Sequence, residues 1–163
     1  MADDFTLSSP DFEPGAPLPT WARARGGGGE DRSPAVAWSG APEGTRSFVL
    51  TLYDPDAPKS GGWWHWAVRD LPATVDSLPA NAGDPDAGLL PAGAVTHPNE
   101  DGQRRYSGAR PPRGHGPHRY VFTVSALDVD QLEVDPSATA ATLNSALGDH
   151  LIGQAQLTGI SET

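Results

Sequence analysis

The 163-residue chain has no cysteine, a single lysine and no long hydrophobic run. Without cysteine it cannot form disulfides, thiolate metal sites or cysteine nucleophiles. Lysine and arginine together number 11 against 21 aspartates and glutamates, which gives a formal net charge of −10. This balance argues against non-specific nucleic-acid binding and against a polybasic membrane anchor, because both need a positive surface.

Targeting and membrane signals are also missing. No apolar stretch approaches the length of a membrane-spanning helix. The acidic start, residues 1–4, lacks the apolar core of a signal peptide. We therefore expect a cytoplasmic protein without an integral membrane segment.

Glycine and proline are abundant, with 19 and 17 copies, and only 37% of the residues are hydrophobic. Such a composition, interrupted by clear apolar runs, indicates many turns between short strands. The chain has five tryptophans, four phenylalanines and three tyrosines, and most of them lie in or next to those runs, which argues against a disordered chain. The length favours one domain over residues 1–163.

The apolar runs predict strands near residues 36–38, 47–53, 64–69, 93–96, 120–127 and 154–160. The run at 47–53 is apolar on both faces, which is typical of a central strand covered on both sides. In the next run, strict alternation predicts Trp64, Trp66 and Val68 on one face and His65 on the other. The segment at 72–117 is mostly loop by composition.

One helix is expected, late in the chain. Asp135 and Pro136 suit a helix start, as a carboxylate cap and a proline in the first helical position. Beyond them, one face at helical spacing carries mostly apolar residues: Leu143, Ala146, Leu147, His150 and Leu151. Strands dominate the rest, so the predicted fold class is mostly β.

Three short segments carry polar side chains within or next to prolines and glycines. They are Asp54-Pro55-Asp56-Ala57-Pro58, Trp63-Trp64-His65-Trp66, and the ten residues at 111–120, PPRGHGPHRY. Asp54 and Asp56 are two residues apart, so in an extended segment both carboxylates can face one cavity. Their proximity is expected to raise the pKa of at least one of them. The adjacent prolines would hold this geometry, and an X-Pro bond there in the cis form is an open alternative.

These groups can receive a small anion. A nearby imidazole, from His65 or His118, is expected to be biased toward its charged form and to donate to the ligand, and Tyr120 can add a hydroxyl donor. Taken singly, the aspartates could form a turn and His65 could be a core histidine. The order and completeness of the three segments favour a pocket. His97 and His150 are expected to be structural.

In these three segments the chain resembles the phosphatidylethanolamine-binding protein family, in its bacterial Raf-kinase-inhibitor-like branch. The resemblance implies a large antiparallel sheet, a smaller sheet packed on one face, and a C-terminal helix. The implied pocket-lining residues are Asp54, Asp56, His65, Pro112, His118 and Tyr120, with Trp66, Arg110, Gly114 and His115 at the rim. The chain departs from the family pattern ahead of the two prolines, where Arg110 brings a cation to the pocket mouth.

The resemblance also implies a function. It suggests a non-catalytic protein that binds phosphate or phosphorylated headgroups, with a kinase or a protease as a regulated partner, no cofactor or resident metal, and a homodimer. The alternative is a metal-dependent phosphoester hydrolase, in which Asp54, Asp56, His65 and His118 hold a divalent ion. No activated nucleophile, P-loop or HExxH pattern accompanies those residues, which favours binding over catalysis.

Overall fold

The computed structural model of the protein describes residues 4–163. Residues 1–3, which belong to the acidic start that predicts no signal peptide, lie outside the described part. Within residues 4–163, no helix combines the length and the apolar character that crossing a membrane requires.

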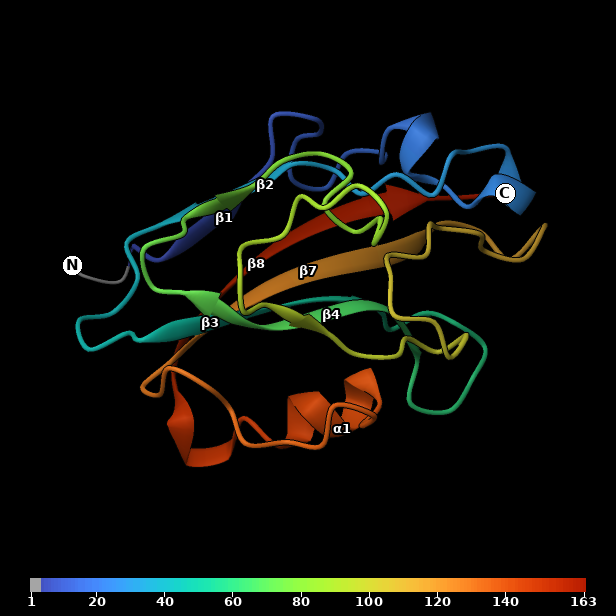
Figure 1. Cartoon of the computed structure of the whole chain (residues 1–163). Coiled ribbons are helices and arrows are strands. Elements are labelled where there is room, and N and C mark those ends of the chain that lie inside the picture. The colour runs from blue at the N-terminus through green and yellow to red at the C-terminus, as the bar shows by residue number, and fades with distance from the viewer. Residues whose placement is uncertain (1–3) are drawn as a thin grey trace.

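Two antiparallel sheets form the body of the molecule (Figure 1). The larger sheet has the order β6-β4-β3-β7-β8, and the smaller has the order β1-β2-β5. The strand bounds of the larger sheet are β3 Ser47–Asp54, β4 Trp63–Pro72, β6 Val95–Thr96, β7 His118–Leu127 and β8 Leu151–Ser161. Those of the smaller sheet are β1 Thr6–Ser8, β2 Val36–Ser39 and β5 Ser77–Leu78. The predicted fold class is confirmed: a mostly β protein with a large sheet, a smaller sheet and one C-terminal helix.

The central strand β3 is covered on both faces, as its sequence predicts. Leu50 and Leu52 point into the core between the two sheets, where they meet aromatic residues such as Trp66 and Phe122. Val49 points the other way, into a second apolar cluster that includes Leu143 of α1 (Ala140–Ser145). In Figure 1 the smaller sheet and α1 accordingly lie on opposite sides of the larger sheet.

The helix is shorter than predicted and starts later. Asp135 caps no helix: its carboxylate accepts hydrogen bonds from the backbone N–H and the hydroxyl of Ser137, which closes a turn. The N-cap is Thr139, whose hydroxyl accepts from the backbone N–H of Thr142. Gly148 adopts a left-handed φ of 46° in the turn after the helix, so the following residues leave the predicted helical face.

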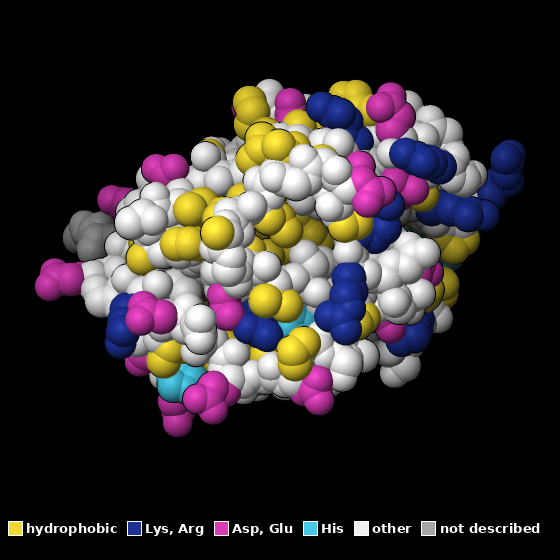
Figure 2. All heavy atoms as spheres, in the orientation of Figure 1, with side chains coloured by type: hydrophobic (Ala, Val, Ile, Leu, Met, Phe, Trp, Pro, Cys, Tyr) yellow, Lys and Arg dark blue, Asp and Glu magenta, His cyan; other side chains and the backbone are white. Residues whose placement is uncertain are grey.

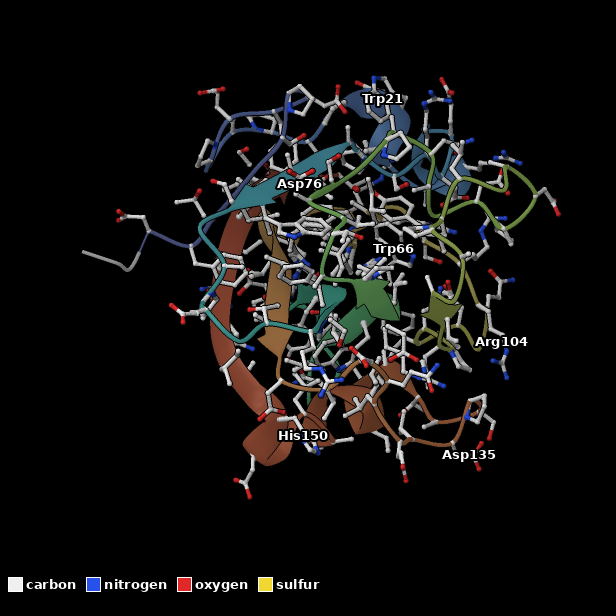
Figure 3. All side chains as sticks on the ribbon, turned by 60° about the vertical axis from the view of Figure 1, so that its left-hand side comes forward. Trp21, Trp66, Asp76, Arg104, Asp135 and His150 are labelled. Carbon is white, nitrogen blue, oxygen red and sulfur yellow. The ribbon has the colours of Figure 1, made fainter. Side chains whose placement is uncertain are left out.

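Consequently His150 and Leu151 do not extend that face. A short 3₁₀ helix at Gly148–His150 precedes β8, which starts at Leu151. His150 lies at the surface (Figure 3), and its Nδ1 hydrogen-bonds to the carboxylate of Asp128. Of the predicted face, Leu143 and Leu147 are buried in the cluster between α1 and the sheet, and Ala146 and Leu151 are partly buried against it.

A β-bulge in β4 overturns the predicted alternation around His65. Leu52 of β3 is opposite Trp66, and the next residue, Tyr53, is opposite Trp64, so His65 is the extra residue of the bulge. Trp66 therefore joins the core between the sheets, while Trp64 packs against the α1 cluster. The bulge also turns His65 toward the side of the sheet on which Trp66 lies.

A buried polar network fastens the segment before α1 to the sheet. The guanidinium of Arg69 donates to His97 Nε2 over 2.9 Å and also pairs with Asp70. Because His97 Nε2 accepts, its Nδ1–H donates to the carbonyl of Ala138, at 2.8 Å. His97 is fully buried, and this desolvation lowers its pKa below 6.5. The prediction that His97 is structural agrees with this position.

Candidate functional site

A cavity of about 480 Å³ opens at the end of the larger sheet where the three predicted segments meet. Strand β3 ends there with Asp54, β4 begins there with Trp63, and β7 begins there with His118. In Figure 1 the connecting loops gather at this end of the sheet, near the C-terminus. Five of the six predicted lining residues do line the cavity: Asp54, His65, Pro112, His118 and Tyr120.

A chain of hydrogen bonds runs from the cavity to the surface. The Asp54 carboxylate, which is 3% exposed, accepts from His118 Nδ1 over 2.7 Å through Oδ2, and from the Asp56 backbone N–H through Oδ1. On the other side of the His118 ring, Nε2 hydrogen-bonds to Nδ1 of the exposed His115. Both nitrogens of His118 are thus engaged within the protein. The expectation that His118 donates directly to an anion is therefore wrong.

His65 has one nitrogen bound and one available. Its Nδ1–H donates to the carbonyl of Ser107 at 2.9 Å. Burial lowers the pKa of His65 below 6.5, so the neutral form is favoured and not the charged form that the sequence suggests. In that neutral form Nε2 carries a lone pair. This atom has no hydrogen-bond partner within residues 4–163, and it is not sealed from solvent.

Tyr120 stands beside these groups with its phenol intact. Its side chain is buried, its ring meets that of His65 in an edge contact, and it lies near the ring of His118. Burial, followed by the charge of Asp54, raises the pKa of Tyr120. The hydroxyl therefore keeps its proton and remains a hydrogen-bond donor.

Asp56 does not share the cavity with Asp54. Its carboxylate forms a bidentate pair with Arg119 on the outside, at 2.8 Å from Nη2 and 3.0 Å from Nε. These hydrogen bonds lower the pKa of Asp56 to about 2, so the rise predicted for at least one carboxylate of the pair does not occur at Asp56. The segment leaves its strand at Asp54 and turns, so the alternation that would put both carboxylates on one side ends there. All peptide bonds of residues 4–163 are trans.

The predicted rim residues have different positions. Arg110 lines the cavity, and its guanidinium lies so close to Gly26 that a Cβ there would be 2.6 Å from Nη1. His115 and Gly114 lie outside the lining, although His115 touches the site through His118. Trp66 is not a rim residue: it is fully buried in the core, with its ring edge-on to Tyr106 (Figure 3).

The sequence pointed to only part of the lining. Trp63, Lys59, Asp31, Asp101 and Ser107 also border the cavity. Trp63 and Lys59 belong to or adjoin the recognised segments, and their composition could have suggested them. Asp31 and Asp101 come from loops with no local signal.

The loop that contains the four glycines at 26–29 borders the cavity through the flanking residues Ala24 and Asp31. It begins with a 3₁₀ turn at Arg25–Gly27, and Asp31 beyond it accepts a hydrogen bond from the backbone N–H of Gly108. The backbone N–H of Ala24 donates to the carbonyl of Ala109 at 3.0 Å. A Cβ at Gly108 would overlap the backbone of Arg23 and Ala24. Glycine is required there because the two loops touch.

Charges around the cavity are mixed. Three carboxylates line it, those of Asp31, Asp54 and Asp101, against the cations Lys59 and Arg110. Lys59 is already paired with Glu100, at 2.7 Å. Figure 2 shows that most of the Lys and Arg side chains on the visible face lie toward the loop-rich end of the molecule. The surface field there is more positive than the net charge suggests, although the cavity itself is rich in acceptors.

The predicted metal ligands do not form a cluster. Within residues 4–163, no group of three or more histidine, aspartate or glutamate side chains has the geometry to hold a metal ion. Asp56 is turned away from the others, and His118 has both nitrogens engaged.

A comparison with protein families matches residues 8–162 to the phosphatidylethanolamine-binding proteins. The chain belongs to the phosphatidylethanolamine-binding protein family. This membership confirms the resemblance drawn from the three segments. The match extends over nearly the whole chain.

Relatives in this family include bacterial proteins of very similar sequence and structure. The UPF0098 protein YbcL of Escherichia coli (strain K12) is 42% identical over 164 residues, covering 99% of this chain and 90% of its own. The crystal structure of Escherichia coli YbcL superimposes with a TM-score of 0.94 over 98% of this chain and 99% of that one. A phosphatidylethanolamine-binding protein homologue from Chlamydia trachomatis, CT736, is 32% identical with a TM-score of 0.84, covering 99% of both chains.

A more distant structure shares the fold alone. The carboxypeptidase Y inhibitor, solved in complex with its cognate proteinase, is 20% identical with a TM-score of 0.57. The match covers 98% of this chain and 84% of that one.

Proposed function

We propose that this family member is a binding protein whose cavity receives a small ligand bearing a phosphate group, such as inorganic phosphate or a phosphorylated headgroup. The observation that carries the proposal is the convergence of Asp54, His65, His118 and Tyr120 on one preformed cavity of about 480 Å³. A volume of this size suits a small ligand. Arg110 at its border supplies a cation for the ligand's negative charge.

The lining side chains are held in place by hydrogen bonds, which supports ligand binding without a conformational change of the site. Asp54 is held by His118 and by the Asp56 backbone, and His65 is held by Ser107. Groups fixed in this way lose little entropy when a ligand arrives. The lining has few cations, so the affinity for a simple anion is expected to be modest.

The test is a thermal-shift titration with phosphate and with phosphorylethanolamine. Either ligand should raise the melting temperature of the wild type, because a ligand that binds only the native state stabilises it. His65→Ala, which removes a lining side chain, should abolish the shift. A matched control is His150→Ala at the exposed surface, which should keep it. A wild type that shows no shift with either ligand would contradict the proposal.

The alternative, a metal-dependent phosphoester hydrolase, has less support because its four predicted ligands are not arranged around one point. Calorimetry with zinc and manganese tests it directly. Stoichiometric binding, together with hydrolysis of a generic phosphoester, would favour this reading over simple binding.

Three further proposals concern the partner, the oligomeric state and the cellular location of the protein. Regulation of a kinase or of a protease partner is proposed from family membership, and the fold shared with the carboxypeptidase Y inhibitor keeps a protease within that proposal. A homodimer is tested by light scattering of the purified chain. The cytoplasmic location is tested by fractionating cells that express the full-length protein.

A further inference from the structure

The base of the cavity presents hydrogen-bond acceptors where an anion site would ordinarily present donors. The Asp54 carboxylate lines the cavity at 3% exposure. His118 and the Asp56 backbone each donate to one of its oxygens, and the Tyr120 hydroxyl lies close enough to interact with the same carboxylate. A carboxylate oxygen accepts more than one hydrogen bond, so Asp54 has acceptor capacity left on the cavity side. A fully deprotonated anion placed there would meet a negative charge.

His65 adds a second acceptor. Its Nδ1–H is committed to the Ser107 carbonyl, so the neutral ring offers the Nε2 lone pair as its remaining polar atom. Desolvation keeps the pKa of His65 below its usual range, which favours that neutral form. The two groups that a ligand meets deep in the cavity, Asp54 and His65, are therefore both hydrogen-bond acceptors.

His118 and His115 fix this arrangement. Because His118 Nδ1–H donates to Asp54, its Nε2 accepts in the neutral ring, and His115 Nδ1–H supplies that hydrogen bond. The His118 ring thus orients the Asp54 carboxylate, and neither of its nitrogens is left to bind a ligand. Pro111 and Pro112 line the wall without any backbone N–H to offer.

From this geometry we infer that the cavity selects a phosphate group that still carries one proton, so that the P–OH donates to Asp54 or His65. The inference rests on the proposed function and narrows its ligand class. Inorganic phosphate and phosphate monoesters can carry such a proton near neutral pH, since the second pKa of a phosphomonoester is about 6. Sulfate esters and phosphodiesters carry none. The preferred headgroup is therefore a monoester such as phosphorylethanolamine, and not the diester of an intact phospholipid.

The remaining oxygens of such a group have suitable partners. The Tyr120 hydroxyl is a donor in the buried lining, and the Arg110 guanidinium lies at the border. The lining's three carboxylates favour a singly over a doubly charged phosphate, because each added negative charge is repelled. The positive ammonium group of phosphorylethanolamine is attracted by the same three carboxylates.

A matched pair of ligands measures how much the phosphate O–H contributes to affinity. At pH 5.5, methyl phosphate and methyl sulfate have nearly the same shape and both carry mainly one negative charge, but only methyl phosphate has an acidic O–H. A hydrogen bond to a charged group makes methyl phosphate bind about tenfold to about a hundredfold tighter. Dissociation constants come from amide NMR titrations of the full chain. Phosphorylethanolamine and glycerophosphorylethanolamine, titrated in parallel, distinguish the monoester from the diester source.

The pH dependence gives a second measurement without any variant. Between pH 5.5 and 8 methyl phosphate loses its proton, so its advantage over methyl sulfate should shrink. Both ligands face the same charged and titratable groups, so the ratio removes those effects of protein titration that act alike on one negative charge in either ligand. These groups are Asp31, Asp54, Lys59, His65, Asp101, Arg110, His118 and Tyr120 in the lining, with His115, Asp56 and Arg119 behind them.

Two variants complete the design. Asp54→Asn replaces the acceptor by an amide of the same size and should reduce the methyl phosphate preference severalfold or more. Asp149→Asn makes the same replacement at an exposed residue that is not part of the lining and should leave the preference unchanged. Equal affinity of the wild type for methyl phosphate and methyl sulfate would overturn the inference while the proposed function survives. Failure of all the anions, including inorganic phosphate, to bind would overturn both. If Asp54→Asn does not fold, the wild-type ratio and its pH dependence decide alone.

Discussion

Lowering the pH from 7.5 to 5.5 should destabilise this protein through two buried histidines, His65 and His97. The pKa of each is lowered from 6.5, first by burial. The unfolded chain therefore binds more protons than the native state in this range, so stability is full above about pH 6.5 and falls as the pH drops below that value. Asp56, with a native pKa of about 2, contributes only at lower pH.

The expected size follows from proton linkage. At pH 5.5 an unfolded histidine is about 90% protonated, and a native imidazole that stays neutral then costs about 1.4 kcal/mol relative to pH 7.5. If both histidines stay neutral in the native state at pH 5.5, they together account for at most about 3 kcal/mol. That is a large share of the roughly 5–15 kcal/mol by which a domain of this size is stable.

A single variant isolates one of the two contributions. His97→Gln cannot titrate, but its amide can still accept from Arg69 and donate toward Ala138. The variant should be less stable at pH 7.5, and it should lose about 1.4 kcal/mol less than the wild type on going to pH 5.5. His150→Gln, at the surface, is the control for removing a histidine.

The assay is urea unfolding of all three proteins at both pH values, followed by tryptophan fluorescence and far-UV circular dichroism. Coincident transitions by the two probes establish two-state behaviour. An identical pH-dependent loss in the wild type and in His97→Gln would refute the reasoning. It would mean that His97 is protonated in the native state, which is incompatible with a donating Arg69 at its Nε2.

Two further predictions concern packing. Leu143→Ala should destabilise the protein by about 2–5 kcal/mol in the same assay, because Leu143 is fully buried where α1 meets the sheet. The control Asn144→Ala, on the exposed side of α1, should change the stability little. Equal effects of the two variants would show that α1 is not docked as described. Gly108→Ala should lower the melting temperature and weaken the thermal shift with phosphate, because a Cβ there overlaps the backbone of the facing loop. Gly27→Ala, which meets only ordinary contacts at 3.5 Å, is its control, and an intact phosphate response in Gly108→Ala would disconnect this loop contact from the site.

Much of the fold was accessible from local pattern. The apolar run at 47–53 predicted a strand covered on both faces, and β3 packs against the smaller sheet on one side and α1 on the other. The predicted helix start at Asp135 is wrong because a carboxylate can accept hydrogen bonds in a turn as readily as at a helix N-cap. In the fold, the Asp135 carboxylate accepts from the backbone N–H and the hydroxyl of Ser137. Local sequence does not distinguish these two uses of the same carboxylate.

The three polar segments at 54–58, 63–66 and 111–120 determined, from sequence alone, the family and the end of the sheet at which a cavity forms. Only the tertiary structure decided how the side chains in them are used. The bulge that turns His65 toward the cavity depends on the pairing of β4 with β3, and Asp56 turns outward because Arg119 is there to receive it. His118 becomes a support for Asp54 because His115 occupies its second nitrogen. Orientation and protonation are set by contacts that form only in the folded chain, and period-two alternation carries no information about them.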